Sequence, residues 1–339
     1  MKVALLHGIR DTRIAQEDTP APAPGECLVE VKAVSICGSD LHIFSEGNVG
    51  GVTWDRPFSP CHEAAGVCHG AAHIPDGTMV TVEPALPCGR CDMCHRAWHH
   101  LCRNLEFAGL PPRQGTLRQF ISWPESALFP APPGIDFAQA ALLEPLAVAV
   151  HAIELVPPPP GARIAVLGCG GIGLCVLQVA RAAGASEILA TDIIPERLEL
   201  ARRLGADVTV RADREDPVAV AAEWSHGEGC DVVYEAAGAP ETPDQAVRML
   251  RPLGQAALLG IPVEDAMTLG ATVGRRHEVT IRWVRRQNHN QTQAIRLVEQ
   301  GLVDLAALAT HRFPLEQAQQ AFELAERKSD GALRVVIEP

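Results

Sequence analysis

The stretch ARIAVLGCGGIGLCVLQVARAAGASEILATD, residues 162–192, decides the fold of this chain. Residues 162–168 form a short apolar run that predicts a buried strand, and residues 172–184 have the length and apolar character of a helix that ends at Gly184. A second apolar run over 187–192 predicts the next strand. Short buried strands that alternate with helices indicate a parallel sheet covered on both faces.

The glycines of this stretch follow the pattern G-x-G-x-x-G, with Gly168, Gly170 and Gly173 between the first strand and the helix. In that position Gly168 permits a tight turn, Gly170 lets the backbone approach a pyrophosphate, and Gly173 lets helix and strand pack closely. The phosphates would then lie at the positive end of the helix. The alternative is a strand–helix–strand unit whose glycines serve packing alone.

Asp192 ends the second strand, about 20 residues beyond Gly173, where a carboxylate accepts hydrogen bonds from an adenosine ribose. A carboxylate there repels a 2′-phosphate, so these residues favour NAD over NADP as the cofactor. Arg197 is the reservation, because a nearby arginine can receive that phosphate. Its alternative interpretation is a solvated charge on the next helix.

The alternation continues beyond this stretch. Further predicted elements are a helix over 195–205, strands over 230–238, 254–260 and 278–284, and a helix followed by a strand in the tail that begins at 313.

The N-terminal side of the chain has a different pattern. Residues 26–37 and 78–86 alternate like strands, among turns rich in glycine and proline. Residues 141–155 have the length and apolar character of a helix, which the four prolines at 157–160 cannot continue.

We therefore expect three parts. They are a β-rich domain over 1–150, a doubly wound domain over 151–290 and a return segment over 291–339.

The overall composition excludes some classes of function. The 339 residues carry a formal net charge of -12, which argues against a surface for nucleic acid or anionic membranes. No run approaches the roughly 18 uninterrupted apolar residues of a membrane-spanning helix. The first 20 residues lack the basic segment, long apolar core and cleavage site of a signal peptide. We expect a cytoplasmic protein.

Four cysteines form the most specific pattern in the chain: Cys88, Cys91, Cys94 and Cys102. Thiolates at this spacing can close a tetrahedral zinc site that leaves no open position for a substrate. The stretch between them has little capacity to bury a core, so the metal would supply the folding energy of this lobe. Disulfides or free thiols are the alternatives. A nucleic-acid-binding zinc ribbon would need a basic face here, and the net charge of the chain argues against one.

A second set of potential zinc ligands is dispersed: Cys37, His62, Glu63 and Glu144. A catalytic zinc site needs three protein ligands and one position open to water or substrate. Their spacing alone does not pair these residues, and a lone cysteine or histidine is more often part of a core.

Together these motifs resemble the zinc-containing medium-chain alcohol dehydrogenases, most closely their sorbitol (polyol) dehydrogenase branch. The resemblance covers essentially the whole chain and is carried by ICGSDLH (36–42), CHEAAG (61–66), VTVEPALPCGRCDMC (80–94), LLEPLAV (142–148), GCGGIG (168–173) and THRFPLEQAQQAFELA (310–325). It implies an α/β protein with a GroES-like β-barrel domain, completed by the C-terminal segment, and a Rossmann domain. It also implies NAD, two zinc ions per chain, a homodimer or homotetramer, and oxidation of a secondary alcohol of a polyol to a ketone.

The resemblance also implies a ligand set for the catalytic zinc. Cys37 and His62 would bind it, with Glu63 as the usual third ligand in polyol and threonine dehydrogenases. Glu144 stands where liver-type alcohol dehydrogenases use a cysteine, and it would bind zinc or hold a zinc-bound water. In a regular strand His62 and Glu63 point to opposite faces, which a bend would overcome, so both glutamates remain candidates.

Further roles follow from the same resemblance. Ser39 and His42 would pass the alcohol proton to solvent; the alternative is a turn-capping serine and a surface histidine. The cofactor would be lined on its adenosine side by Gly171, Ile172, Asp192 and Arg197, and near the nicotinamide by Gly260, Ile261, Pro262, Trp283, Val284 and Arg285.

Three positions depart from the pattern of the family. Cys61 replaces the usual glycine before His62, and Ile43 replaces a tyrosine that contacts substrate in sorbitol dehydrogenases. Arg286 replaces an aromatic residue after Arg285, itself a predicted substrate contact. We therefore expect a substrate other than sorbitol, with a carboxylate or phosphate that pairs with Arg286. The alternative for Arg286 is a side chain that faces solvent or a subunit interface. The alternatives for the whole protein are a threonine- or butanediol-type dehydrogenase and a zinc-free reductase.

Overall fold

The computed structural model of the chain describes residues 1–49, 51–54, 57–264 and 266–339. It divides into two compact units. The N-terminal unit comprises Met1–Glu144, Ala294–Glu299 and Leu305–Pro339, and the central unit comprises Pro145–Gln293 and Gln300–Asp304. The predicted boundary after residue 150 lies inside a helix, α4, that begins in the N-terminal unit and continues into the central unit.

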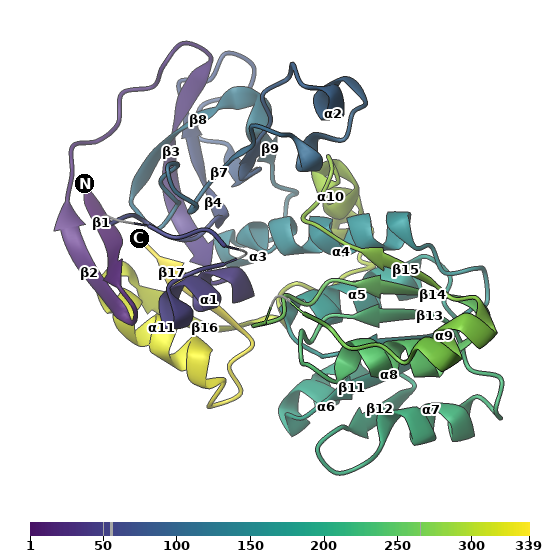
Figure 1. Cartoon of the computed structure of the whole chain (residues 1–339). Helices are drawn as coiled ribbons and strands as arrows, with labels where there is room; N and C mark the ends of the chain where they lie inside the picture. Colours follow the sequence, from purple (N-terminus) through teal and green to yellow (C-terminus); the bar gives the residue numbers. More distant parts are fainter. Residues whose placement is uncertain (50, 55–56, 265) are drawn as a thin grey trace. The chain divides into compact units, whose positions relative to one another are not determined.

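The central unit is built on a six-stranded parallel sheet in the order β12-β11-β10-β13-β14-β15, drawn in teal to green in Figure 1. Its strands are β10 (Arg163–Leu167), β11 (Glu187–Asp192), β12 (Val208–Arg211), β13 (Cys230–Glu235), β14 (Leu250–Leu258) and β15 (Thr280–Trp283). Its helices are α4 (Leu143–Leu155), α5 (Gly171–Ala182), α6 (Pro195–Arg203), α7 (Pro217–Trp224), α8 (Thr242–Met249), α9 (Ala271–His277) and α10 (Gln291–Glu299), of which α4 and α10 are shared with the N-terminal unit.

The strand order reverses between β10 and β13, because β11 and β12 extend the sheet to one side and β14 and β15 to the other. In parallel sheets of this kind, ligands bind outside the carboxyl ends of the strands where the order reverses. This is a Rossmann arrangement. The carboxyl ends of β10, β11, β13, β14 and β15 therefore share one edge of the sheet, and the turns that follow them lie side by side there.

The N-terminal unit contains a mainly antiparallel sheet in the order β16-β17-β3-β4-β5-β9, with β8 also paired to β3. Its strands are β1 (Lys2–Gly8), β2 (Asp11–Gln16), β3 (Glu26–Ser35), β4 (Glu63–His69), β5 (Met79–Val82), β6 (Ala85–Leu86), β7 (Glu106–Phe107), β8 (Phe120–Pro124), β9 (Leu128–Pro130), β16 (Ala309–Pro314) and β17 (Arg334–Glu338). Its helices are α1 (Gly38–Glu46), α2 (Asp92–His95), η1 (His99–Leu101), η2 (Glu125–Ala127), α3 (Phe137–Ala141), η3 (Leu315–Gln317) and α11 (Ala318–Arg327).

Alternation of apolar residues builds the core of this unit, as the sequence predicts for a strand over 26–37. In β3, Cys27, Val29 and Val31 point into the core, while the residues between them are partly exposed. The strand predicted over 78–86 is interrupted and forms β5 and β6.

The last part of the chain completes the N-terminal unit. Strand β17 pairs antiparallel with β3, with Val336 opposite Ser35. The predicted helix and strand of the tail are α11 and β17, whereas β16 has no counterpart among the predicted elements.

One helical stretch, Phe137–Leu155, is long and apolar enough to cross a membrane by composition alone. In this fold 78% of its most apolar window is buried inside the protein, so the stretch is a core element.

A buried ion pair joins β17 to β4. Arg334 Nη1 donates to both carboxylate oxygens of Glu63, at 2.8 and 2.9 Å, and neither side chain is more than 5% exposed. Removal of one partner would leave an uncompensated buried charge.

We therefore expect Arg334→Met to lower the free energy of unfolding by about 3–5 kcal/mol, measured by urea titration. The control is Arg327→Met, which removes an exposed pair with Glu323 at 3.0 Å and should cost less than about 1 kcal/mol. An equal loss in both variants would contradict this role for Arg334.

Candidate functional site

The four predicted cysteine ligands lie together in the lobe between β6 and β7. Their sulfurs are within 4.8 Å of one another, with 3.5 Å between Cys91 and Cys94 and 3.9 Å between Cys91 and Cys102. A tetrahedral ion with Zn–S bonds of about 2.3 Å requires sulfurs roughly 3.8 Å apart. The cluster therefore has the dimensions of a four-cysteine zinc site.

The electrostatics of these thiols also fit a cation. Backbone N–H groups of Arg103 and Cys94 lower the pKa of Cys91 to about 6. Burial, followed by the neighbouring thiols of Cys91 and Cys102, raises the pKa of Cys94 to about 12. Four thiolates this close together repel one another, so all four ionise together only around a positive ion.

A second group of potential ligands lies at the end of β3 and the start of β4. The ligand atoms of Cys37, His62 and Glu63 are all within 4.8 Å of one another. Cys37 is the N-cap of α1, and His62 directly precedes β4. Cys61 has φ of +70°, so the backbone bends before His62, and the expected alternation of His62 and Glu63 across a strand does not apply.

Asp40 organises this group. Its Oδ2 accepts from Cys37 N at 2.9 Å, and its Oδ1 accepts from Cys61 N at 3.2 Å. The same Oδ1 lies 3.6 Å from His62 Nδ1. Burial lowers the pKa of His62, but the Asp40 carboxylate outweighs it and the pKa is raised well above its usual value. Asp40 thus faces Nδ1 of the ring and leaves Nε2 to bind a metal.

Of the two glutamate candidates, Glu63 lies in the group with Cys37 and His62, and Glu144 does not. Glu144 is buried at the start of α4, with 4% exposure. Both oxygens of Glu63 accept from Arg334, but an ionised carboxylate has about four lone-pair sites and can still bind a metal. The geometry favours Glu63 as the third ligand.

The other predicted residues of α1 separate into two sets. Ser39 and His42 are partly exposed and three positions apart, so they share one face of the helix. His42 Nδ1 lies 3.1 Å from Glu46 Oε1, which orients the ring. Ile43, in contrast, is 2% exposed and packs in the hydrophobic core, and its contact with a substrate stays a prediction.

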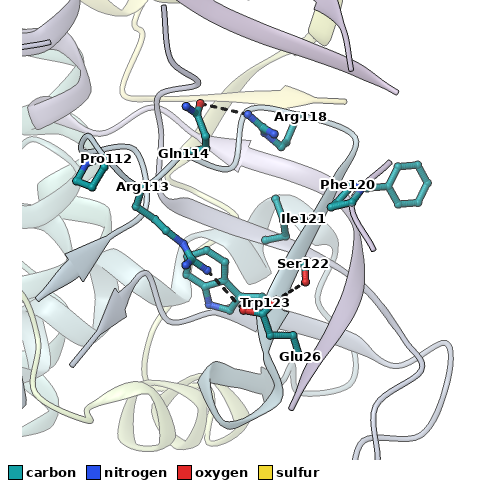
Figure 2. A pocket seen from close by; sticks show the side chains of 11 residues that line it. Glu26, Pro112, Arg113, Gln114, Arg118, Phe120, Ile121, Ser122 and Trp123 are labelled. Atoms are coloured by element: carbon teal, nitrogen blue, oxygen red, sulfur yellow. Dashed lines mark hydrogen bonds and ion pairs between the residues drawn. The ribbon is translucent and has the colours of Figure 1, made fainter. Parts of the chain in front are cut away.

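A pocket of about 350 Å³ opens on the N-terminal unit, lined by β8 and the segment before it. Figure 2 shows Arg113 over the ring of Trp123, with 4.8 Å between the guanidinium carbon and the ring centroid. Gln114 accepts from Ser59 N at 2.8 Å and thereby ties the pocket wall to the segment that precedes His62. The two arginines of the pocket, Arg113 and Arg118, are paired with glutamates of the same chain. We therefore do not assign a ligand to this pocket.

The predicted cofactor residues lie at the carboxyl ends of the central sheet. Gly168 has φ of +91°, and a Cβ there would lie 2.8 Å from Ala237 N. A Cβ on Gly173 would lie 1.8 Å from Gly168 O, whereas one on Gly170, the N-cap of α5, would meet no atom closer than 4.0 Å. The turn is therefore closed to side chains at its base and open at Gly170, where a phosphate can approach the helix N-terminus. Gly171 and Ile172 form the first turn of α5.

Asp192 is held rigidly at the end of β11. Its two carboxylate oxygens accept from Cys169 N at 2.8 Å and from Ile194 N at 2.9 Å. Arg197 follows on α6, and its Nη1 lies 4.0 Å from the Cβ position of Gly170. This group fits the adenosine side of a dinucleotide.

The remaining predicted residues follow β14 and β15. Gly260, Ile261 and Pro262 lie just beyond β14, and Trp283, Val284 and Arg285 end and follow β15. Ile261 is 46% exposed and Trp283 is 65% exposed, so both offer apolar surface at this edge. Arg286 has φ of +56°, a conformation that non-glycine residues rarely adopt.

Sequence reasoning missed three residues beside the candidate metal ligands: Asp40, Arg334 and Phe107, whose ring lies 4.9 Å from that of His62. Asp40 had a local signal, because an acid three residues after an N-cap is typical of a capping box, which the structure forms here. Arg334 had none, since it is 271 residues from Glu63.

Comparison with known proteins gives consistent matches over the chain. Residues 23–133 match the family model described as alcohol dehydrogenase GroES-like domain, and residues 171–300 match that of zinc-binding dehydrogenase. The sorbitol dehydrogenase of Bacillus subtilis (strain 168) is 33% identical over 100% of this chain and 97% of its own length. L-threonine 3-dehydrogenase of the same organism is 34% identical over 88% and 87%. L-idonate 5-dehydrogenase of Vitis vinifera is 31% identical over 96% and 91%.

Solved structures give the same picture. An Escherichia coli oxidoreductase/dehydrogenase of unknown specificity matches with a TM-score of 0.94 and 31% identity, over 99% of this chain and 98% of that one. A zinc-binding dehydrogenase of Sinorhizobium meliloti 1021 bound to NADP matches with 0.92 and 28%, over 100% and 99%. Galactitol-1-phosphate dehydrogenase of Escherichia coli matches with 0.91 and 25%, over 100% of both chains.

The contacts of Asp40 lead to a prediction for metal affinity. Asp40→Asn keeps the shape of the side chain but replaces one acceptor oxygen with an NH2 donor. The variant side chain therefore cannot accept hydrogen bonds from Cys37 N and Cys61 N at the same time. We expect zinc affinity at Cys37 and His62 to fall about 10–100-fold, measured by competition with a chelator. The matched control is Asp11→Asn, which alters an exposed carboxylate paired with Arg13, outside both groups of zinc ligands. Equal affinity in wild type and Asp40→Asn would contradict this role.

Proposed function

Because the chain belongs to the zinc-containing medium-chain alcohol dehydrogenases, near their sorbitol dehydrogenase branch, we propose that it oxidises a secondary alcohol of a polyol or sugar-derived substrate to a ketone, with hydride transfer to NAD. The observation that carries this proposal is the convergence of Cys37, His62 and Glu63 within 4.8 Å. Three ligands of this kind leave one coordination position for an alcohol oxygen.

We propose a separate role for each residue of the catalytic zinc site. When bound, zinc supplies Lewis acidity at the alcohol oxygen and the nicotinamide accepts the hydride. Cys37, His62 and Glu63 would hold the metal, and Asp40 orients the imidazole of His62.

Proton release is the task that we propose for α1. The Ser39 hydroxyl can both accept and donate a hydrogen bond, and the His42 ring offers one donor and one acceptor nitrogen, so the pair can pass the alcohol proton towards solvent. Glu46 supports this proposal because its carboxylate holds the His42 ring through Nδ1.

A second zinc ion would be structural. Cys88, Cys91, Cys94 and Cys102 fill all four positions of a tetrahedral ion, so this site has no position for a substrate. We thus propose two zinc ions per chain. We also propose a cytoplasmic location, because cysteines grouped as metal ligands are typical of a reducing compartment.

NAD is the cofactor that we propose over NADP. The support is the Asp192 carboxylate, which two backbone N–H groups hold at the end of β11 where it would repel a 2′-phosphate. Arg211, on the neighbouring strand, is occupied by Ile193 O and Asp213. Arg197 remains the residue that would accept a 2′-phosphate.

We propose that the protein is a homodimer or homotetramer. Support comes from the central unit, where β15 is one of the two edge strands of the sheet and Leu253, Val263 and Trp283 are each at least 65% exposed. A monomeric mass by light scattering at micromolar concentration would refute this proposal.

Loss of either zinc ligand gives the first test. We expect Cys37→Ser and His62→Ala to abolish turnover and to lower the zinc content from about two to about one per chain. Affinity for NADH, measured by fluorescence, should stay within about 2-fold, because the nucleotide residues belong to the central unit. His73→Ala removes an exposed histidine outside both groups of zinc ligands and serves as the control. Undiminished turnover in either ligand variant would refute the mechanism.

The substrate class is tested by a panel assayed with NAD and with NADP. It contains neutral polyols, 2,3-butanediol, L-threonine, sugar acids and sugar phosphates. We expect turnover with NAD on sugar-derived secondary alcohols. If acidic members are preferred, Arg286→Ala should raise their KM about 10-fold or more and leave neutral polyols unchanged. A preference for neutral diols that survives Arg286→Ala would refute the pairing with an anion, and a preference for threonine would refute the polyol class.

A further inference from the structure

Glu235 occupies a particular place in the central sheet. It is the last residue of β13, which pairs with β10 where the strand order reverses. Its side chain is fully buried, with 0% exposure, and no residue role proposed above uses it. The two halves of a dinucleotide bind on opposite sides of such a reversal point. Because Asp192 and the turn at Gly168 form the adenosine half, the turns after β13 and β14 face the nicotinamide half.

The carboxylate of Glu235 holds the turn that follows its own strand. Oε1 accepts from Ala237 N at 2.8 Å, from Gly238 N at 2.7 Å and from Thr242 Oγ1 at 2.8 Å. Its backbone carbonyl accepts from Leu259 N at 2.7 Å, which joins this turn to the one after β14. One residue thus binds two neighbouring turns.

These turns are packed without space for side chains. A Cβ on Gly260 would lie 2.3 Å from Gly238 N and 2.6 Å from Glu235 Oε2. A Cβ on Gly238 would lie 2.6 Å from Ile261 O. Ala237, in turn, lies against the Gly168 turn. A shift in the Glu235 side chain would therefore displace the backbone of both turns.

Oε2 of Glu235 is buried and has no hydrogen-bond partner among the described residues. No ion pair between described residues neutralises this carboxylate either. A buried carboxylate is costly unless its hydrogen bonds are satisfied, so an apolar residue would suit a purely structural core better. Because a glutamate stands here despite the free-energy cost of burying its carboxylate, the three hydrogen bonds that Oε1 accepts point to a function.

We infer that Glu235 is a positioning residue for the nicotinamide half of the cofactor. Through Ala237, Gly238 and the turn at Gly260 it sets the backbone wall that this half contacts. The inference rests on the proposed use of a nicotinamide dinucleotide. It concerns binding rather than proton or hydride transfer, so binding measurements test it directly.

The test compares two ligands on the zinc-loaded protein. Glu235→Ala removes the acceptor of three hydrogen bonds, and we expect its Kd for NADH to rise about 10-fold or more. Its Kd for AMP, which occupies the adenosine half alone, should stay within about 2-fold, and its zinc content should equal that of wild type. The matched variant Glu235→Gln keeps an oxygen that accepts the same three bonds, so its Kd for NADH should stay within about 3-fold of wild type.

The other outcomes are distinct. Unchanged NADH affinity in Glu235→Ala would overturn the inference, and so would an equal loss of NADH and AMP affinity, which indicates general damage. A loss in Glu235→Gln as large as in Glu235→Ala would overturn the hydrogen-bond explanation. Failure of the wild type to bind NADH would instead refute the proposed function.

Discussion

Where the turns after β10, β13 and β14 meet, the backbone segments touch directly, and a Cβ on Gly173, Gly260 or Gly238 would lie 1.8 to 2.6 Å from a neighbouring backbone atom. The same constraint applies beside the metal ligands. A Cβ on Gly115 would lie 2.2 Å from Pro60 O, and one on Gly109 would lie 2.8 Å from Cys61 O. Both sites depend on this close backbone packing, because it holds the turns without flexible side chains between them.

How much of each site could be predicted depended on how local its contacts are. The cysteine lobe and the phosphate turn each lie within about 15 consecutive residues, so spacing alone carried the information. Cys37 and His62 are brought together by pairing of β3 with β4, with Ser35 opposite Glu63, and no sequence spacing encodes that register. The resemblance to a family supplied the pairing. The ion pair of Arg334 with Glu63 could not be predicted from the sequence, because it depends on the pairing of the C-terminal strand β17 with β3.

Element types were more predictable than their ends. Strand β11 occupies the predicted residues 187–192, and α6 begins at Pro195, a residue with φ suited to a helix start. Strand β14 begins at Leu250, four residues before the predicted start, although Pro252 and Gly254 disfavour a strand. There the pairing with β13 shifts register, so the tertiary contact overrides the local signal.

The charges around the group of Cys37, His62 and Glu63 agree with the proposal that Glu144 is not an additional ligand of the catalytic zinc. Binding of a metal requires a neutral His62, so ionised Cys37, Asp40 and Glu63 would then carry three negative charges, and Arg334 supplies one positive charge. A divalent cation would bring the sum to zero, which favours burial in a region of low dielectric constant. Glu144 as an additional ligand would leave a net negative charge. Removal of Arg334 would have the same effect, so the C-terminal strand contributes to the metal site as well as to the fold.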